Sequence, residues 1–513
     1  MEKKDKFLLL ILVIISMALR ILFLKDRMFI DVDGTIYAIL GKNLLSGYGY
    51  MYNGNVDTIF PPFYPLMIGL IWKIIGNLEL SSFVVSILAG SFMLLPVFLL
   101  ANQMYGRRVA ILSSIITIIY WPLLVYSTRS LSEALFCFLI AIAMYLGYRV
   151  TKESGLRHII VLGLVLGCAY LTRPEGFLFF LYILAFFSIS KICQIGKGDF
   201  IKIVTFIAIF SVFLFSYMSF LHNYTGRWQL SSKTDAVLVM SDFDVKITND
   251  PLAYEKNRYL LEDPSRYFRQ KTTGHHLKRY IKNIRFQYWA FLYLVEPWLI
   301  AFICIGLFRK SWDNQRRKKE IYLLGLWLPS LVIPLFWVST RFLMPFLSII
   351  VLWTANGIVG LTDWASETFH HRRGRKIVIA VIIVASTLLF LKDSFKEYVV
   401  SKNEMPYEYK EMGVWLKQNI DGIEHKVIMS RRPFVSFYAG SKWISIPYGV
   451  NSLDLLNFLK KETVEYLIID ERLIPLLRPA LIPLLNEKIN HNGLQVKQVI
   501  YHPKKIICYQ VKK

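Results

Sequence analysis

Residues 3–27 read KKDKFLLLILVIISMALRILFLKDR, and this stretch decides the class of fold. The segment Phe7–Leu24 is apolar along most of its length and has close to the ~20 residues that a helix needs to cross a bilayer. Basic residues precede it, as in a signal peptide, but no small-residue cleavage site follows. We therefore expect a retained first membrane span.

Similar apolar runs recur through the first 392 residues, and 55% of the 513 residues are hydrophobic. A soluble chain of this length would need far more polar surface to cover its core. The sequence therefore predicts a polytopic α-helical membrane protein with about eleven spans. They are expected near residues 7–24, 79–101, 108–126, 131–150, 157–172, 175–192, 201–221, 289–308, 320–338, 342–361 and 376–392.

The short loops between these runs differ in charge, and this difference predicts the orientation. With a cytoplasmic N-terminus, every strongly basic short loop falls inside, and the short loops predicted outside hold far fewer cations. The formal charge of +24 is then explained by topology and by attraction to anionic membrane lipids, and no nucleic-acid partner is expected. We expect a multi-pass protein of the plasma membrane. The basic loops are those at 107–108, 149–158, 191–202, 309–319 and 370–376.

Three regions then face the outside, namely 25–78, 222–288 and 393–513. Within the first, Phe60–Gly76 is apolar but short, and it would reverse the side of the Arg107-Arg108 loop if it crossed the membrane. It begins Phe60-Pro61-Pro62, and proline suits the first turn of a helix. We expect a helix that lies in the outer interface. Residues 1–392 should form the transmembrane domain.

The tail, 393–513, alternates helical and strand patterns, which favours a small extracytoplasmic α/β domain. Its expected helices are Tyr407–Ile420 and Leu453–Lys461, and its expected strands are Lys426–Ser430, Tyr466–Asp470, Val496–Tyr501 and Lys505–Val511. No Gly-rich phosphate loop occurs in it, so no nucleotide site is predicted. The five cysteines of the chain show no CxxC or Cys/His ligand spacing, which argues against a structural zinc site.

Two acids, Asp31 and Asp33, follow the first span directly. In an extended segment the side chains at i and i+2 point the same way, so both would face one side. Such a pair can share a proton or a divalent cation, and one carboxylate can take a proton from an attacking hydroxyl. The alternative is a solvated turn, because Asp-x-Asp-Gly is ordinary turn chemistry. Two acids are too few ligands to require a metal, so no cofactor is assigned.

Further motifs follow in order along the chain. They are Asp33 to Ala38 (DGTIYA), Asn43 to Tyr50 (NLLSGYGY), Pro61 to Pro65 (PPFYP), Tyr105 to Arg108 (YGRR), Tyr126 to Glu133 (YSTRSLSE), Leu171 to Gly176 (LTRPEG) and Thr340 to Pro345 (TRFLMP). Together they resemble the membrane glycosyltransferases of the GT-C class, most closely the protein-mannosyltransferase and aminoarabinose-transferase group of the family-39 type. The resemblance extends over residues 1–392.

The resemblance implies transfer of a sugar from a polyprenyl-phosphate-linked donor to an acceptor on the outer side of the membrane, and one displacement would invert the anomeric centre. The essential first-loop acid of the family maps onto Asp33, with Asp31 as the flanking acid. The family often has Asp-Glu where this chain has Asp33-Gly34. Some relatives carry a lysine, which contacts the lipid phosphate, where this chain has Phe60. Another cation must therefore serve here.

Three arginines at predicted outer ends of spans are candidates for that cation. Arg129, Arg173 and Arg341 could each hold the donor phosphate through a forked guanidinium. The alternative for each is snorkelling to the membrane interface.

Two acids and two tyrosines complete the candidate site. Glu133 could be a second catalytic acid or an acid favoured at a helix start. Glu175 could bind substrate or pair with Arg173, two residues earlier in the chain. Tyr37 and Tyr64, from the motifs quoted above, are expected to contact substrate.

Other membrane functions stay open. A transporter or flippase of lipid-linked saccharides would need charged groups near mid-membrane, often in broken and repeated helices. The predicted spans hold little central charge and show no twofold repeat. A polymerase or ligase of lipid-linked saccharides is a further alternative. The acceptor could be a lipid, an envelope glycan or a protein.

Overall fold

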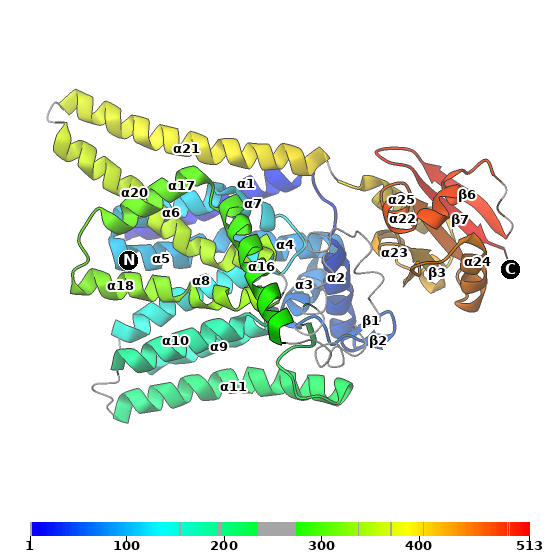
Figure 1. The fold of residues 1–513 in the computed structure, drawn as a ribbon, viewed down its shortest axis with the longest axis horizontal. Helices are drawn as coiled ribbons and strands as arrows, with labels where there is room; N and C mark the ends of the chain where they lie inside the picture. Colours follow the sequence, from blue (N-terminus) through cyan, green and yellow to red (C-terminus); the bar gives the residue numbers. More distant parts are fainter. Residues whose placement is uncertain are drawn as a thin grey trace.

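The computed structural model describes residues 3–152, 155–191, 197–233, 237, 273–336, 338–369, 372–403, 405–489, 491 and 493–512. Most of the predicted large outer loop, 222–288, lies outside the described residues. Helices of the first four hundred residues form a bundle, and the tail forms a separate unit at one end of it (Figure 1). The N-terminus lies at the opposite end. Helix α21 (Arg372–Asn403) runs along the bundle towards the tail and extends past residue 392.

Six helical stretches of the described residues are long and apolar enough to cross a membrane. A seventh results if the bent pair α16 (Thr273–Leu294) and α17 (Pro297–Phe308) forms one span. The polytopic helical class is therefore confirmed, and the structure supports six or seven spans by this criterion. The six are Lys3–Leu24 (α1); Leu78–Tyr105, with α4 (Leu78–Phe92) and α5 (Leu94–Tyr105); Glu133–Lys152 (α8); Gly198–Thr225, in α11 (Lys197–Thr225); Thr340–Thr368, with α19 (Thr340–Leu343), η4 (Met344–Phe346) and α20 (Leu347–Thr368); and Arg373–Val400, in α21.

The remaining predicted spans are shorter or interrupted helices. Pro122, Pro329 and Pro334 each stand in the first turn of a new helical piece, because proline lacks the N–H that would continue the preceding helix. Pro297 opens α17 at a bend of 89°, so the predicted span 289–308 is not a straight helix. The pieces are α6 (Arg107–Ile119), α7 (Trp121–Tyr126), α9 (Leu156–Thr172), α10 (Gly176–Lys191), α18 (Asn314–Gly325), η2 (Leu328–Leu331) and η3 (Ile333–Leu335).

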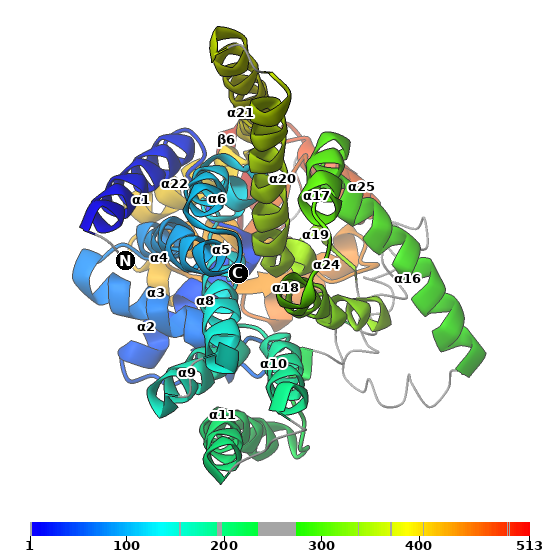
Figure 2. The ribbon, with the colours of Figure 1, turned by 90° about the vertical axis from the view of Figure 1, so that its left-hand side faces the viewer.

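The interior of the bundle is built from a few of these helices. Seen from the end opposite the tail, α5, α8 and α20 occupy the middle, and α1, α11, α16 and α21 lie at the periphery (Figure 2). Burial agrees, since 83% of the apolar window in Thr340–Thr368 is buried against 17% in α11 and in α21. The peripheral helices therefore present apolar faces to the surrounding lipid.

The segment predicted as the first outer loop is folded into a cap across the end of the bundle. It consists of α2 (Val32–Leu45), a hairpin of β1 (Met51–Tyr52) and β2 (Asn55–Val56), and α3 (Phe63–Ile75). The hairpin turns at Asn53-Gly54, where both residues have the positive φ that such a turn requires. Helix α3 follows Pro62, ends at the left-handed Gly76, and packs on α2 and α4.

The tail contains a mixed five-stranded sheet among its described residues. In sheet order the strands are β4 (Lys442–Ser445), β3 (Val427–Ser430), β5 (Tyr466–Asp470), β7 (Ile506–Val511) and β6 (Leu494–Ile500). The first three are parallel and the last two pairings are antiparallel. The other elements are α22 (Tyr407–Asn419), η5 (Ile423–His425), α23 (Phe434–Ala439), α24 (Ser452–Lys461), α25 (Ile474–Leu477) and η6 (Pro479–Leu485).

The predicted elements of the tail are all present, and the mixed α/β character is confirmed. Strand β4 and helix α23 were not predicted, because each is only one short pattern of four to six residues at the sheet edge.

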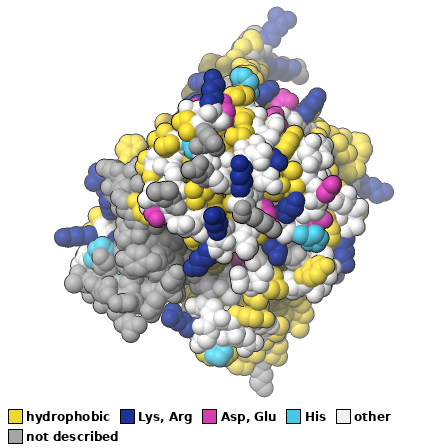
Figure 3. Space-filling view, turned by 90° about the vertical axis from the view of Figure 1, so that its right-hand side faces the viewer, with side chains coloured by type: hydrophobic (Ala, Val, Ile, Leu, Met, Phe, Trp, Pro, Cys, Tyr) yellow, Lys and Arg dark blue, Asp and Glu magenta, His cyan; other side chains and the backbone are white. Residues whose placement is uncertain are grey.

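Lys and Arg side chains are dispersed over the outward face of this end of the molecule (Figure 3).

The tail contacts the chain segment that joins α1 to α2. The Phe29 ring packs against Phe434 at a centroid distance of 4.8 Å and against Tyr438 at 5.9 Å. The Tyr438 hydroxyl donates to Glu79 Oε1 at 2.6 Å and accepts from the Ile30 N–H at 3.2 Å. Lys410 of α22 forms an ion pair with Glu79 at 2.7 Å. These contacts hold the tail beside the start of α2.

Candidate active site

Asp31 precedes α2 and is bound by the connection between α7 and α8. Its Oδ1 accepts from Nε of Arg129 at 3.1 Å and from Nη2 of the same guanidinium. Its Oδ2 accepts from the N–H and the Oγ of Ser130, both at 3.2 Å. Asp31 therefore attaches the start of α2 to Arg129 and Ser130.

Asp33 lies in the first turn of α2 and meets a different arginine. Its Oδ2 accepts from Nη1 and Nη2 of Arg341, both at 3.1 Å. Arg341 belongs to α19, far along the chain. The Asp33 side chain is 30% exposed and that of Arg341 is 25% exposed, so this pair is accessible to a ligand.

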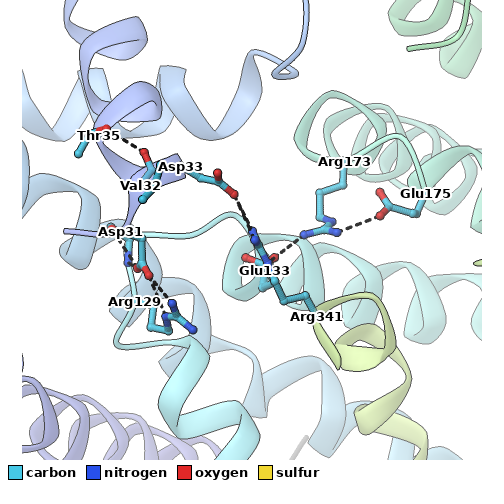
Figure 4. Close-up of polar contacts among 10 residues, drawn as sticks. Asp31, Val32, Asp33, Thr35, Arg129, Glu133, Arg173, Glu175 and Arg341 are labelled. Atoms are coloured by element: carbon cyan, nitrogen blue, oxygen red, sulfur yellow. Dashed lines mark hydrogen bonds and ion pairs between the residues drawn. The ribbon is translucent and has the colours of Figure 1, made fainter. Parts of the chain in front are cut away.

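Glu133, the first residue of α8, joins two arginines. Its Oε1 accepts from Nε of Arg341 at 2.5 Å and from Nη1 of Arg173 at 2.6 Å. Arg173 also donates to Glu175 Oε1 at 2.9 Å, so the predicted Arg173–Glu175 pair is formed. The result is a row of alternating charges, Asp33–Arg341–Glu133–Arg173–Glu175 (Figure 4).

Asp31 and Asp33 do not face the same side, contrary to the expectation from an extended segment. Helix α2 begins at Val32, so the backbone is helical here instead of extended, and residues two apart point to different sides. Figure 4 shows Asp31 directed to Arg129 and Asp33 directed to Arg341. The two carboxylates are thus not a pair that shares one proton.

Gly34 stands where the family often has a second acid, and the structure gives a steric reason. A Cβ atom at this position would lie 2.2 Å from Ser130 Oγ and 2.7 Å from the Ser130 carbonyl oxygen. A larger side chain would push α2 away from Ser130, which also binds Asp31. The second carboxylate near Asp33 comes from Glu133 of α8 instead.

Tyr37 of α2 and Tyr64 of α3 pack against each other within the cap. Their rings meet edge to face at a centroid distance of 5.1 Å, and Tyr37 also contacts the Phe60 ring at 4.9 Å. The Tyr64 hydroxyl shares a hydrogen bond with Ser86 Oγ at 2.9 Å. Both side chains are buried, with Tyr64 at 0% and Tyr37 at 2% exposure. The structure therefore places Tyr64 in the support of α2 and α3, and Tyr37 one turn after Asp33.

An apolar cavity of about 180 Å³ adjoins the row of charges. The Phe342 ring in its wall lies 5.2 Å from the Arg173 guanidinium carbon, which places the cavity next to that arginine. Charged groups enter the wall at Glu175 and Lys233. The lining residues are Pro174, Glu175, Phe177, Leu178, Leu230, Lys233, Val237, Val332, Ile333, Phe336 and Phe342.

Lys233 is the residue of this region that sequence reasoning missed. Its ammonium lies 5.2 Å from the centre of the Phe60 ring, and Phe60 occupies the position at which some relatives have a lysine. No carboxylate of the described residues forms an ion pair with it. Burial, followed by the positive charge of Arg173, lowers the pKa of Lys233. The missing lysine at Phe60 was the available signal, but sequence spacing could not show which distant cation reaches that place.

The chain is similar to proteins of one known family and to several solved structures. The dolichyl-phosphate-mannose-protein mannosyltransferase family matches residues 60–218. ArnT from Cupriavidus metallidurans, solved with undecaprenyl phosphate, superposes with a TM-score of 0.59 at 9% identity, over 97% of both chains. The Archaeoglobus fulgidus oligosaccharyltransferase, solved with zinc and sulfate, gives a TM-score of 0.59 at 16% identity over 90% of this chain and 67% of that chain.

A second structure of that archaeal enzyme, AglB with an inhibitory peptide and a dolichol-phosphate, gives a TM-score of 0.58 at 15% identity, over 91% of this chain and 70% of that chain. A comparison with curated protein sequences finds no significant match. The chain therefore has the fold of the GT-C membrane glycosyltransferases, and residues 60–218 match a family of that class. The predicted resemblance to GT-C enzymes that use a lipid-phosphate-linked sugar is confirmed.

The candidate site combines paired cations with unused carboxylate oxygens. Oε2 of Glu133 and Oε2 of Glu175 are buried and accept no hydrogen bond from the residues that the structure describes. Within the same residues, no cluster of three or more His, Cys, Asp or Glu side chains could hold a metal ion. The site therefore offers arginines and a lysine for an anion, and carboxylate oxygens for hydroxyl groups.

Proposed function

We propose that the chain transfers a sugar from a polyprenyl-phosphate donor to an acceptor on the extracytoplasmic side, with Asp33 as the residue that receives or orients the acceptor proton. One observation carries this proposal. Asp33 is the most exposed carboxylate in the row of alternating charges, and that row borders an apolar cavity whose lysine, Lys233, forms no ion pair with the residues that the structure describes.

The phosphate of the donor would bind at Arg341, Arg173 and Lys233. A guanidinium can contact two phosphate oxygens at once, and the half-buried ammonium of Lys233 adds a point charge. The start of the polyprenyl chain would lie in the cavity against Phe177, Phe336 and Phe342. Solved relatives support a lipid phosphate here, since the ArnT structure holds undecaprenyl phosphate and the AglB structure holds a dolichol-phosphate.

Arg129 takes a different part in this proposal. Its guanidinium is bonded to Asp31, and its side chain is 40% exposed. It would hold Asp31, and through Asp31 the start of α2, so that Asp33 stays opposite Arg341. Asp31 then acts as a positioning residue.

The reaction would be a single inverting displacement. An acceptor hydroxyl or amine attacks the anomeric carbon, and the bond between this carbon and the phosphate oxygen breaks. The electron pair of that bond goes to the polyprenyl phosphate, whose growing charge is stabilised by Arg341 and Arg173. Asp33 takes the acceptor proton. Glu133 and Glu175 would accept hydrogen bonds from sugar hydroxyls through their unused oxygens.

We also propose that the N-terminus is cytoplasmic, that the chain crosses the membrane eleven times and that the membrane is the plasma membrane. The support is the placement of basic loops. The turns between α5 and α6, α17 and α18, and α20 and α21 all lie at the end opposite the tail, and all were predicted inside. The α1–α2 segment, with Asp31 and Asp33, lies at the tail end.

The test is a transfer assay with the full chain in liposomes. Radiolabelled polyprenyl-phosphate monosaccharides serve as donors, and an envelope extract serves as the acceptor source. Asp33→Asn is expected to lower kcat by about 100-fold or more, the low end of what a general base contributes. Binding of the donor should change by only a few-fold.

Asp26→Asn is the matched control, because Asp26 is an exposed acid of the same loop that pairs with Lys402. It should keep the wild-type rate. A folded Asp33→Asn variant with full activity would disprove the role of Asp33. Movement of intact donor across the bilayer without release of polyprenyl phosphate would show a flippase instead of a transferase.

A further inference from the structure

A second, polar cavity of about 550 Å³ is lined by residues of α5, α6, α17, α18 and α20 and of the segments that join them. Figure 1 shows the α5–α6 turn and the α17–α18 connection at the end of the bundle away from the tail. Three parts of the chain form its wall, namely the turn between α5 and α6, the connection from α17 to α18, and the end of α20 (Figure 2). The proposed transfer reaction takes place at the other end of the bundle and does not involve this cavity.

The charge of the lining is strongly biased. Six cations face two carboxylates, Asp313 and Asp363. Asp363 is shared, because Arg108 contacts it at 2.7 Å and Arg309 at 3.8 Å. Lys310 has no ion-pair partner among the described residues. The cations are Arg107, Arg108, Arg309, Lys310, Arg316 and Lys319.

One of these cations is held rigidly in place. Arg316 donates through Nη2 to the carbonyl oxygens of Gly306 and Leu307, both at 2.9 Å. Its Nε lies 3.6 Å from Glu320, a fully buried carboxylate that also accepts from Tyr105 and Trp353. The fixed cation in the wall makes this a preformed site for an anion.

The cavity also includes the first turn of α6. Gly106 precedes this helix of 13 residues, and no side chain caps its amides. Arg107, Arg108 and Val109 line the cavity directly. Uncapped amides at a helix start favour a phosphate, and the surrounding cations reinforce that preference.

An open apolar groove continues from this cavity over the outer surface of α17 and α20. The two share Ile305 and Arg309 as lining residues. The groove adds Cys304, Phe308, Leu361 and Trp364, and Phe308 and Trp364 are 71% and 48% exposed. A basic pocket and an apolar groove that meet at one arginine have the complementary shape and charge of an anionic amphiphile.

We propose that this end of the molecule binds an anionic glycerophospholipid, with its phosphate in the basic cavity and an acyl chain along the groove. Basic pockets between membrane helices commonly select such headgroups. The bound lipid would join the α5–α6 turn to the α17–α18 connection across the cavity. The proposal does not depend on the identity of the transferred sugar or on the role of Asp33.

The test uses the full chain, purified in detergent and freed of lipid, and titrated in native mass spectrometry. Phosphatidylglycerol is compared with phosphatidylcholine of the same acyl chains and with glycerol phosphate, which has no chains. Phosphatidylglycerol should bind at least tenfold more tightly than either. Equal binding of phosphatidylcholine overturns the charge argument, and equal binding of glycerol phosphate overturns the role of the groove.

Variants locate the site. Arg309→Gln and Lys310→Gln should each weaken phosphatidylglycerol binding about fivefold, as expected for about 1 kcal/mol per cation near a lipid headgroup. Trp364→Ser should weaken it through the groove. Arg317→Gln is the matched control, since Arg317 is a neighbouring cation of α18 outside the lining. An equal loss with Arg317→Gln would show general attraction and contradict the proposal.

Lys310→Gln keeps the test decisive if Arg309→Gln fails to fold, because Arg309 also pairs with Glu367 at 3.2 Å. Unchanged binding in a folded Lys310→Gln variant together with a folded Trp364→Ser variant would overturn the proposed site.

Discussion

Glu133 is the least exposed carboxylate of the active site, and both arginines proposed to hold the donor phosphate meet at it. Its side chain is 1% exposed and contacts Arg341 and Arg173 through the same oxygen. A buried carboxylate is tolerated only when it is paired, and here the pairing also fixes the two guanidinium groups beside Asp33. Glu133 thus sets the geometry of the site through its partners.

Replacement of Glu133 by Gln should destabilise the protein by about 3–5 kcal/mol, because buried Arg173 and partly exposed Arg341 both lose the charge that compensates them. The donor KM should rise as well. Thermal unfolding in detergent and donor titration measure the two effects. Glu175→Gln is the control for stability, since the Glu175 side chain is 24% exposed and, among the described residues, forms an ion pair with Arg173 alone, so the destabilisation should be clearly smaller. Equal effects of the two variants would contradict this role of Glu133.

Lys233 predicts a pH dependence. Because burial and Arg173 lower its pKa, the ammonium loses its proton at a lower pH than an ordinary lysine, whose pKa is ~10.4. The phosphodiester of the donor stays anionic throughout this range. Donor binding should therefore weaken as the pH rises through the lowered pKa of Lys233. The other charged groups that act on Lys233 are Arg341, Asp33, Glu175 and Asp57.

The measurement is the donor KM between pH 7 and pH 10. Wild-type KM should rise over this range, and Lys233→Arg should remove the rise because a guanidinium stays protonated. Lys233→Met should have a high KM at every pH. An unchanged pH profile in Lys233→Arg would assign the titration to another group.

Helix α1 is attached to the rest of the bundle by a polar contact as well as by apolar packing. Arg20 is fully buried and donates to Ser127 Oγ at 2.7 Å, beyond the end of α7. It also donates to the Thr117 carbonyl oxygen of α6 at 3.4 Å and to Ser16 of its own helix. One side chain therefore joins α1 to two other helices close to the active-site end.

Arg20→Ala should lower the free energy of unfolding by about 1–3 kcal/mol, because buried polar partners lose their hydrogen bonds. Arg20→Lys should not restore it, since an ammonium cannot reproduce the fork of donors. Thermal unfolding in detergent tests both variants. Lys6→Ala, at an exposed position of the same helix, is the control. Wild-type stability in Arg20→Lys would contradict the need for the fork.

The tail and the membrane bundle meet at the segment between α1 and α2, which leads into the candidate active site. Phe29 packs among tail aromatics, and the Ile30 N–H donates to Tyr438. Asp31 follows at once and anchors α2. Docking of the tail therefore restricts the chain two to four residues before Asp33, and we expect transfer activity to depend on it.

Tyr438→Phe removes the hydroxyl that bridges Glu79 and Ile30 and should lower kcat several-fold while the bundle stays folded. Tail release under limited proteolysis should become faster. The control is Tyr501→Phe, because the Tyr501 hydroxyl contacts only Glu487 within the described tail. Unchanged kcat with a released tail would show that the tail does not act on the site.

Much of the architecture follows from local pattern. Apolar runs of bilayer length predicted the helical membrane class, and strand-helix alternation predicted the tail sheet. Such features depend on neighbours within one turn or one strand. The breaks were harder to foresee, because Pro297 could have been absorbed in a kinked span, whereas packing turns the chain there by 89°.

The active site shows the same division. The order of motifs and the charge pattern along the chain were enough to reveal the resemblance to GT-C enzymes and to pick out the charged residues at the helix ends. The partners of these residues follow from the tertiary structure. Asp33 pairs with Arg341, Asp31 pairs with Arg129, and the ammonium of Lys233 lies over the ring of Phe60. The physical reason is that electrostatic and hydrogen-bond energies depend on distance in space, and these pairs come from helices and loops whose approach is set by packing.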